Sequence, residues 1–89
     1  MEKASEAILK FLLNRHYIGG KHFPEHHLIS SRTKWLSKHE KSLFQDEYDG
    51  LVREGCIIRL KKRTGRGSEW HISLNPEKIG EICKKVETR

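Results

Sequence analysis

The stretch Leu51-Val52-Arg53-Glu54-Gly55-Cys56-Ile57-Ile58 marks the point where the hydrophobic pattern of the chain changes its period. Before it, apolar residues recur at the three- and four-residue spacing of an amphipathic helix. After it, they alternate every second residue, which is typical of a strand. Gly55 is the expected end of the helix, because glycine takes up the left-handed conformation that often follows a last helical turn. The stretch therefore predicts a helix that passes through a glycine into β-structure.

The helix before this junction has a clear start. Ser37-Lys38-His39-Glu40 is a capping box, in which Ser caps the first turn and Glu, three residues later, bonds back to the cap. We expect the helix over about residues 38–54. Its apolar face is expected to consist of Leu43, Phe44, Tyr48, Leu51 and Val52.

Two more helices are expected earlier in the chain. Apolar residues at helical spacing predict the first over about residues 3–15. The second, over about residues 24–29, is short: Pro24 fits its first position, and Glu25 suits the positive end of its dipole. The polar stretch 30–34 is then expected to be a connector.

After the junction, the alternating pattern predicts a β-hairpin over about residues 57–74. It turns at Thr64-Gly65-Arg66-Gly67-Ser68, whose two glycines are expected to supply the positive-φ positions of the loop. In the second strand one face is expected in the core and the other in solvent. The core face would hold Trp70, Ile72 and Leu74, and the solvent face Glu69, His71 and Ser73.

This order of a helix, a short helix, a long helix and a basic hairpin resembles the winged helix-turn-helix domain. The junction at 51–58 is similar to the end of that family's third helix and the start of its wing. The resemblance covers about residues 4–74. Two shorter stretches, Ile18-Gly19-Gly20-Lys21-His22 and the segment from Thr64 to Pro76, are also similar to small uncharacterised archaeal winged-helix proteins.

The resemblance implies an α+β fold in which residues 1–89 form a single winged-helix domain. It would have three helices, a β-hairpin wing and a C-terminal helix over about residues 76–86, which Asn75-Pro76-Glu77 begins. It also implies nucleic-acid binding, with the helix 38–54 in a major groove and the wing against the adjacent backbone or minor groove.

Length and composition limit what such a chain does. Its 89 residues are 35% hydrophobic and 34% charged, and 18 Lys and Arg against 12 Asp and Glu leave a net charge of +6. We expect no membrane span, no secretory leader and no large enzyme with a deep pocket. Cys56 and Cys83 are isolated within apolar patterns, as in proteins that keep their thiols reduced. The composition favours a cytoplasmic domain, or one associated with the nucleoid or ribosome, that binds an anionic partner.

The hairpin is strongly basic between residues 59 and 66. It carries five cations and no acid there: Arg59, Lys61, Lys62, Arg63 and Arg66. Alternation places Arg59, Lys61 and Arg63 on one face, with Arg66 at a tip whose glycines allow close approach to phosphate. Charge on a hairpin also blocks edge-to-edge pairing of strands, and that alternative stays open. We expect contact with phosphate, since edge protection rarely needs five charges of one sign.

A second set of cations lies before the helix 38–54. Lys21, Arg32 and Lys34 are expected to flank the main contact and to bind phosphate. Gly19-Gly20-Lys21-His22 precedes the positive end of the second helix, so its backbone amides would form an anion seat. Alternatively, the glycines serve only the conformation of a turn.

The solvent face of the helix 38–54 changes its chemistry along its length. The first two turns present side chains that suit phosphates and base edges: Lys38, Lys41, Ser42 and Gln45. The second half is acidic, with Asp46, Glu47, Asp49 and Glu54. Phosphates repel carboxylates, so only the start of the helix is expected to enter a groove. The acidic half would instead suit a basic protein partner.

Catalysis and metal binding are not expected. His22, His26 and His27 lie close in sequence, but Pro24 interrupts them, and no C-x-x-C pair or nucleophile–base arrangement stands nearby. We therefore predict no catalytic residues, no metal ligands and no cofactor. Trp35 and Trp70 are both expected in the core, although Trp35 also suits stacking on a base.

Together these observations predict a non-enzymatic nucleic-acid-binding protein, most directly a small DNA-binding transcriptional regulator or chromatin-type factor. An RNA-binding or ribosome-associated role is the alternative, and a protein-interaction module that docks through the acidic half of the helix 38–54 is a further one. The expected partner is duplex DNA or structured RNA and not a membrane, with a homodimer or a ribonucleoprotein assembly as the higher-order state.

Overall fold

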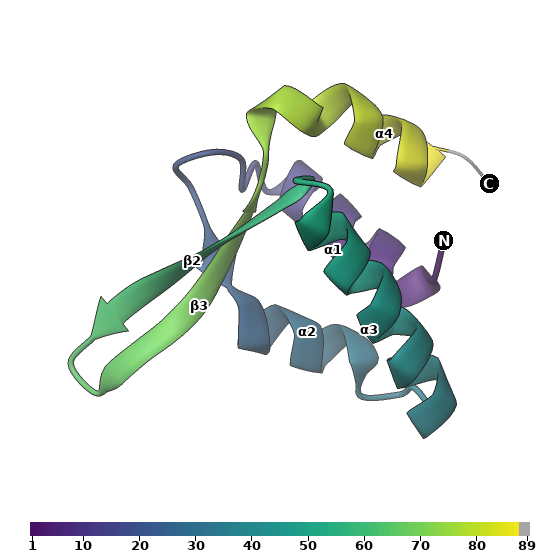
Figure 1. Ribbon diagram of the computed structural model, residues 1–89, viewed down its shortest axis with the longest axis horizontal. Helices are drawn as coiled ribbons and strands as arrows, with labels where there is room; N and C mark the ends of the chain where they lie inside the picture. The colour runs from purple at the N-terminus through teal and green to yellow at the C-terminus, as the bar shows by residue number, and fades with distance from the viewer. Residues whose placement is uncertain (88–89) are drawn as a thin grey trace.

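The computed structural model describes residues 1–87 of the chain. These residues form an α+β fold with four α-helices and a three-stranded antiparallel sheet, which confirms the α+β part of the predicted fold class. The elements are α1 (Lys3–Asn14), β1 (Phe23–Pro24), α2 (Glu25–Thr33), α3 (Lys38–Arg53), β2 (Ile57–Thr64), β3 (Gly67–Leu74), the 3-10 helix η1 (Pro76–Lys78) and α4 (Ile79–Glu87). In Figure 1, α1, α2 and α3 form one body, α4 lies above them, and the β2–β3 hairpin projects away to the left.

Helix α3 begins and ends as its capping signals predict. The Ser37 hydroxyl accepts a hydrogen bond from the Glu40 amide at 3.1 Å, and the Glu40 carboxylate accepts one from the Ser37 amide at 2.8 Å. The capping box is therefore confirmed. After the last turn, Gly55 has φ +85°, a conformation that residues with a Cβ rarely adopt, and its amide donates to the Val52 carbonyl.

Helix α2 is longer than the sequence predicts. It extends to Thr33, so the predicted connector 30–34 is mostly helical. The Ser31 and Thr33 hydroxyls donate to backbone carbonyls three and four residues earlier, at 2.9 and 2.8 Å. These bonds satisfy the hydroxyls inside the helix, which offsets their usual preference for loops. At the other end, Pro24 pairs with His71 of β3 and is the N-cap of α2, one position before the first helical position that the sequence predicts for it.

The C-terminal part differs in detail from the prediction of one helix over residues 76–86. It begins with the 3-10 turn η1, and the α-helix α4 follows from Ile79. The Asn75 side chain accepts a hydrogen bond from the Glu77 amide at 3.0 Å, which confirms the predicted cap.

The predicted hairpin is confirmed, with one difference in its turn. Strands β2 and β3 pair from Ile57 opposite Leu74 to Thr64 opposite Gly67, and β1 pairs with the other edge of β3. Of the two loop glycines, only Gly67 has a positive φ, of +130°, whereas the sequence predicts both.

The core lies between the helices and the root of the hairpin, and the predicted alternation in β3 is confirmed there only for Ile72 and Leu74. His71 and Ser73, which the pattern assigns to solvent, are 8% and 0% exposed. The reason is that the segment before α2 lies along β3: Ile18 bridges to Leu74, and His22 contacts His71. The largest fully buried side chains are Phe44, Ile8, Leu9, Leu12, Leu28, Ile57, Ile72, Leu74 and Ile82.

Neither tryptophan is in the core, which overturns both expectations. Trp35, in the turn between α2 and α3, is 84% exposed. Trp70 is 40% exposed and lies just beyond Ile72, which is fully buried. The helices cover only the root of the hairpin, so a side chain two residues further out has no second layer to pack against (Figure 1).

Among residues 1–87, no helix combines the length and the apolar character that crossing a membrane requires.

Candidate nucleic-acid interface

The outer half of the β2–β3 hairpin is the most accessible basic part of the molecule. Every residue from 61 to 70 is exposed. The two-residue loop at the tip is held by the Thr64 hydroxyl, which accepts from the Arg66 amide and donates to the Gly67 carbonyl, each at 3.2 Å. The tip is thus an ordered turn that carries the Arg66 side chain outward.

Four of the five predicted hairpin cations are available to a ligand. Lys61, Lys62, Arg63 and Arg66 are exposed, and within residues 1–87 none of them forms an ion pair. The single acid of the hairpin, Glu69, bonds to His71 at 2.9 Å. The hairpin therefore presents uncompensated positive charge over its outer half.

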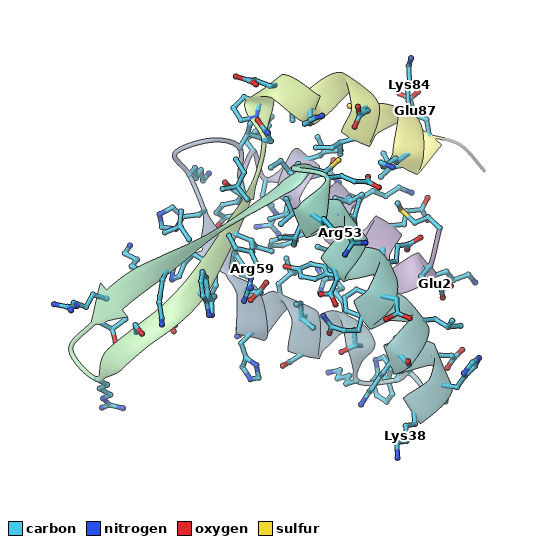
Figure 2. The ribbon with its side chains drawn as sticks, in the orientation of Figure 1. Glu2, Lys38, Arg53, Arg59, Lys84 and Glu87 are labelled. Atoms are coloured by element: carbon cyan, nitrogen blue, oxygen red, sulfur yellow. The ribbon has the colours of Figure 1, made fainter. Side chains whose placement is uncertain are left out.

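Arg59, the fifth predicted cation, is bound within the protein. Its guanidinium donates to the Glu25 carboxylate at 2.8 Å, and the Tyr48 hydroxyl donates to the other Glu25 oxygen at 2.7 Å. The hydrogen bond to Glu25 raises the pKa of Arg59, while burial, followed by the same carboxylate, raises the pKa of Tyr48. Figure 2 shows Arg59 in the space between the hairpin and α2.

These three residues line a cleft of about 310 Å³ between α2, α3 and the root of β2. Asp49 and Arg53 of α3 also line it. Two carboxylates and two guanidinium groups thus face one cleft, so its charge is balanced. The cleft separates the basic hairpin from the start of α3 and does not itself attract an anion.

The predicted contact residues at the start of α3 are exposed, but one of them is engaged. Lys38, Lys41 and Ser42 are open to solvent. The Gln45 amide donates to the Asp49 carboxylate at 2.8 Å, so its donor is not free to bond a base without breaking that contact. Figure 2 shows Lys38 at the far end of the molecule from the hairpin tip.

Two of the three predicted flanking cations, Lys21 and Arg32, lie over neighbouring aromatic rings, because the Phe11 and Tyr17 rings are stacked with their centroids 5.9 Å apart. Lys21 donates to the Arg15 carbonyl at 3.2 Å and lies over the Tyr17 ring, while Arg32 lies over the Phe11 ring at 5.2 Å. Of the three cations, only Lys34 lies beside a ring that is open to solvent. Its ammonium is 5.2 Å from the centroid of the Trp35 ring. The structure does not bring the three together with the hairpin cations into one cluster.

The turn at Gly19-Gly20-Lys21-His22 already uses two of its four backbone amides within the protein. The Gly19 amide donates to the Leu74 carbonyl at 3.0 Å, and the Lys21 amide points to the Ile18 carbonyl at 3.5 Å. Gly19 has φ +67°, so glycine is needed there for conformation. Of the two alternatives that the sequence leaves open, the structure favours the turn.

Sequence reasoning missed a polar contact on the opposite face of the hairpin. His22 and His71 share a hydrogen bond between their Nδ1 atoms at 2.8 Å, and His71 continues through Nε2 to Glu69. Burial lowers the pKa of His22, and the nearby His71 and Lys62 add to this effect. Within residues 1–87, no three His, Cys, Asp or Glu side chains gather as a metal site would require.

Sequence reasoning also missed the surroundings of Trp70. The Arg59 guanidinium lies 4.2 Å and the Lys61 ammonium 5.6 Å from the centroid of its ring. The hairpin register would have indicated the second contact, because Lys61 is directly opposite Trp70. The Arg59 contact depends on Glu25, which lies 34 residues away in the chain.

No family model, curated protein or solved structure matches this chain.

Proposed function

We propose that this chain is a winged helix-turn-helix domain that binds nucleic acid without catalysing a reaction. The element order and the antiparallel hairpin after α3 support that architecture. The observation that carries the function is the projecting hairpin with four exposed cations, Lys61, Lys62, Arg63 and Arg66, and no ion pair among them in the described residues. Phosphate is the anion that several unpaired cations spread over a projecting hairpin fit, because each contact releases a counterion from the nucleic acid.

The start of α3 is the second contact in this proposal. Lys38, Lys41 and Ser42 are exposed there, and the helix begins with a free, capped turn. The longest dimension of the domain is 41 Å. Each strand of a duplex has one phosphate per ~3.4 Å of helix axis, so a duplex of about 12 base pairs spans that length. Hairpin and helix start would then contact one duplex at two separated places.

The acidic residues limit how the duplex lies. Asp46 and Asp49 are exposed on α3, and Gln45 is held by Asp49. A duplex laid along the whole of α3 would place its phosphates against these carboxylates. We therefore propose that the hairpin contacts the phosphate backbone of the duplex, and that α3 contacts the duplex only through its first two turns. Whether the biological role is that of a DNA-binding regulator or of an RNA-bound protein depends on the polymer it prefers.

A charge-reversal experiment tests this proposal. The Lys62→Glu/Arg66→Glu variant changes two exposed hairpin cations, and we expect it to weaken binding to a duplex of about 14 base pairs by about 10-fold or more. The measurement is fluorescence anisotropy with labelled DNA and RNA duplexes of matched sequence. Circular dichroism checks that the variant is folded.

The matched control is Lys78→Glu/Lys84→Glu, which changes net charge by the same amount on η1 and α4, away from the hairpin and from the start of α3. Lys84 lies on α4, at the opposite end of the molecule from the hairpin tip (Figure 2). We expect this variant to bind nearly as well as the unchanged protein. Equal loss in both variants, or no duplex binding by the unchanged protein, would overturn the proposal.

A further inference from the structure

Trp70 exposes its indole although a small domain gains stability when it buries a large aromatic side chain. Trp70 is 40% exposed and does not belong to the core cluster or to the partly buried side chains packed against it. It stands on the outer half of β3, next to the four available hairpin cations.

The ring of Trp70 is held in place from two other elements. Arg59 lies over the ring at 4.2 Å. The same guanidinium donates to Glu25 of α2, and Glu25 also accepts from Tyr48 of α3. Glu25 and Tyr48 are 8% and 3% exposed, so the groups that fix the Arg59 guanidinium are buried, although Arg59 itself is open to solvent. An ordered flat side chain loses little conformational freedom when a second ring stacks on it.

The hairpin face that carries Trp70 is basic and free of acids. Lys61 is paired with Trp70, and Arg63 is paired with Ser68, so these four side chains share one face. Glu69 belongs to the other face, where it bonds to His71. A ligand on the Trp70 face thus meets a π-surface flanked by cations. That combination matches a nucleobase attached to phosphates, whereas an acidic peptide would leave the indole unused.

We propose that the indole of Trp70 stacks on an unpaired nucleobase of the bound nucleic acid, while Lys61 and Arg63 hold its phosphates. This inference rests on the proposed function and names its preferred target: a duplex with a single-stranded extension. Bases within a duplex are already stacked on their neighbours and offer no free face, so only an unpaired base fits this site.

Trp35, the other exposed tryptophan, lacks these features. It is 84% exposed and has one cation, Lys34, at 5.2 Å, but no buried support comparable to Glu25 and Tyr48 among the described contacts. It lies in the turn before α3 and not on the hairpin. Trp35 is therefore the matched control for an effect that arises from exposure of an indole alone.

The test compares a blunt duplex of about 14 base pairs with the same duplex bearing a single-stranded extension of about six nucleotides, in DNA and in RNA. The unchanged protein should bind the extended duplex more tightly. Trp70→Leu, which keeps an apolar side chain without a π-face, should weaken binding of the extended duplex by about 10-fold and leave blunt-duplex binding unchanged. Trp70→Phe should keep most of the preference, and Trp35→Leu should keep all of it.

A fluorescence readout locates the base. In a Trp35→Phe variant the remaining indole is Trp70, and we expect its emission to be quenched by the extended duplex but not by the blunt one. An equal effect of Trp70→Leu on both duplexes, or no preference for the extension in the unchanged protein, would overturn the inference while leaving the proposed function intact. Failure to bind any of the four nucleic acids would overturn both. The DNA and RNA arms show which polymer supplies the base.

Discussion

Arg59 carries the same charge as Lys61 and Arg63 and lies on the same face of β2. Its guanidinium, however, donates a hydrogen bond to the Glu25 carboxylate at 2.8 Å. The cause lies with Glu25, which is only 8% exposed. A buried carboxylate without a partner is costly, so the nearest cation is drawn into an ion pair. The available charge of the hairpin is thereby reduced to four cations, while Arg59 serves as the support for Trp70.

His22 is the residue whose titration should affect stability. Its Nδ1 lies 2.8 Å from Nδ1 of His71, and a hydrogen bond between two ring nitrogens needs one of them unprotonated. Lys62 and His71 both face His22, and Glu69 reaches the pair only through His71. Burial, followed by the nearby His71 and Lys62, lowers the pKa of His22 below its ordinary value of 6.5.

Because the pKa of His22 is lower in the folded than in the unfolded chain, the unfolded chain binds more protons below pH 6.5. The stability from this contact is complete above that pH and is lost as the pH falls. We expect the free energy of unfolding in urea to be lower at pH of about 5.5 than at about 7.5. Glutamine does not titrate, so the His22→Gln variant should show a smaller difference between its free energies of unfolding at the two pH values.

The control for this prediction is His26→Gln on the exposed side of α2, where the ring contacts Ser30 and not a second histidine. It should keep the pH dependence of the unchanged protein. The same pH dependence in His22→Gln as in the unchanged protein would contradict the assignment.

Some secondary-structure elements are fixed by sequence signals that lie within a few residues of chain. The start of α3 is decided by Ser37 and Glu40, whose reciprocal bonds are formed within four residues of chain. Strand β3 shows the contrary case. Its alternation predicts burial of Trp70 and exposure of His71 and Ser73, and all three are reversed because burial depends on which other segments cover each face.

The cap of α3 is a measurable contribution to stability. Ser37→Ala removes the acceptor for the Glu40 amide, and we expect it to lower the free energy of unfolding by about 1 kcal/mol. Urea unfolding followed by circular dichroism measures the change. Ser42→Ala, an exposed serine inside the same helix, is the control and should be neutral or slightly stabilising, because alanine has the higher helix propensity. Equal effects of the two substitutions would show that the capping box does not anchor the helix.

At the scale of the whole molecule, charge is distributed unevenly around a nearly uncharged centre. The hairpin and the start of α3 are basic and exposed, while the cleft between them is lined by two carboxylates and two guanidinium groups, those of Glu25, Asp49, Arg53 and Arg59. The net charge of +6 therefore understates the local charge of the hairpin. Association with a polyanion should depend on the local charge of the hairpin and of the start of α3, and not on the net charge of the whole protein.

The salt dependence of binding follows from this distribution. Four hairpin cations predict a slope of log K against log salt of about −3.6 for duplex DNA, and one contact from α3 would bring it to about −4.5. The Lys62→Glu/Arg66→Glu variant should flatten the slope by about two. Anisotropy titrations at several salt concentrations measure both values. An unchanged slope in the variant would show that phosphate contacts lie elsewhere on the surface.

The sequence by itself determined the helices, the capping box of α3, the stop at Gly55, the bounds of the hairpin and its concentration of positive charge. Each of these depends on residues that are close in the chain or directly paired across a tight turn. Only the tertiary structure decided which charges are free, since Arg59 meets a carboxylate 34 residues away and Tyr48 reaches the same group across 23 residues. It also decided that α2 continues through its serines and that Trp70 lies outside the core. The physical reason is that propensity and pattern act locally, whereas burial and charge pairing depend on what the folded chain places on each face.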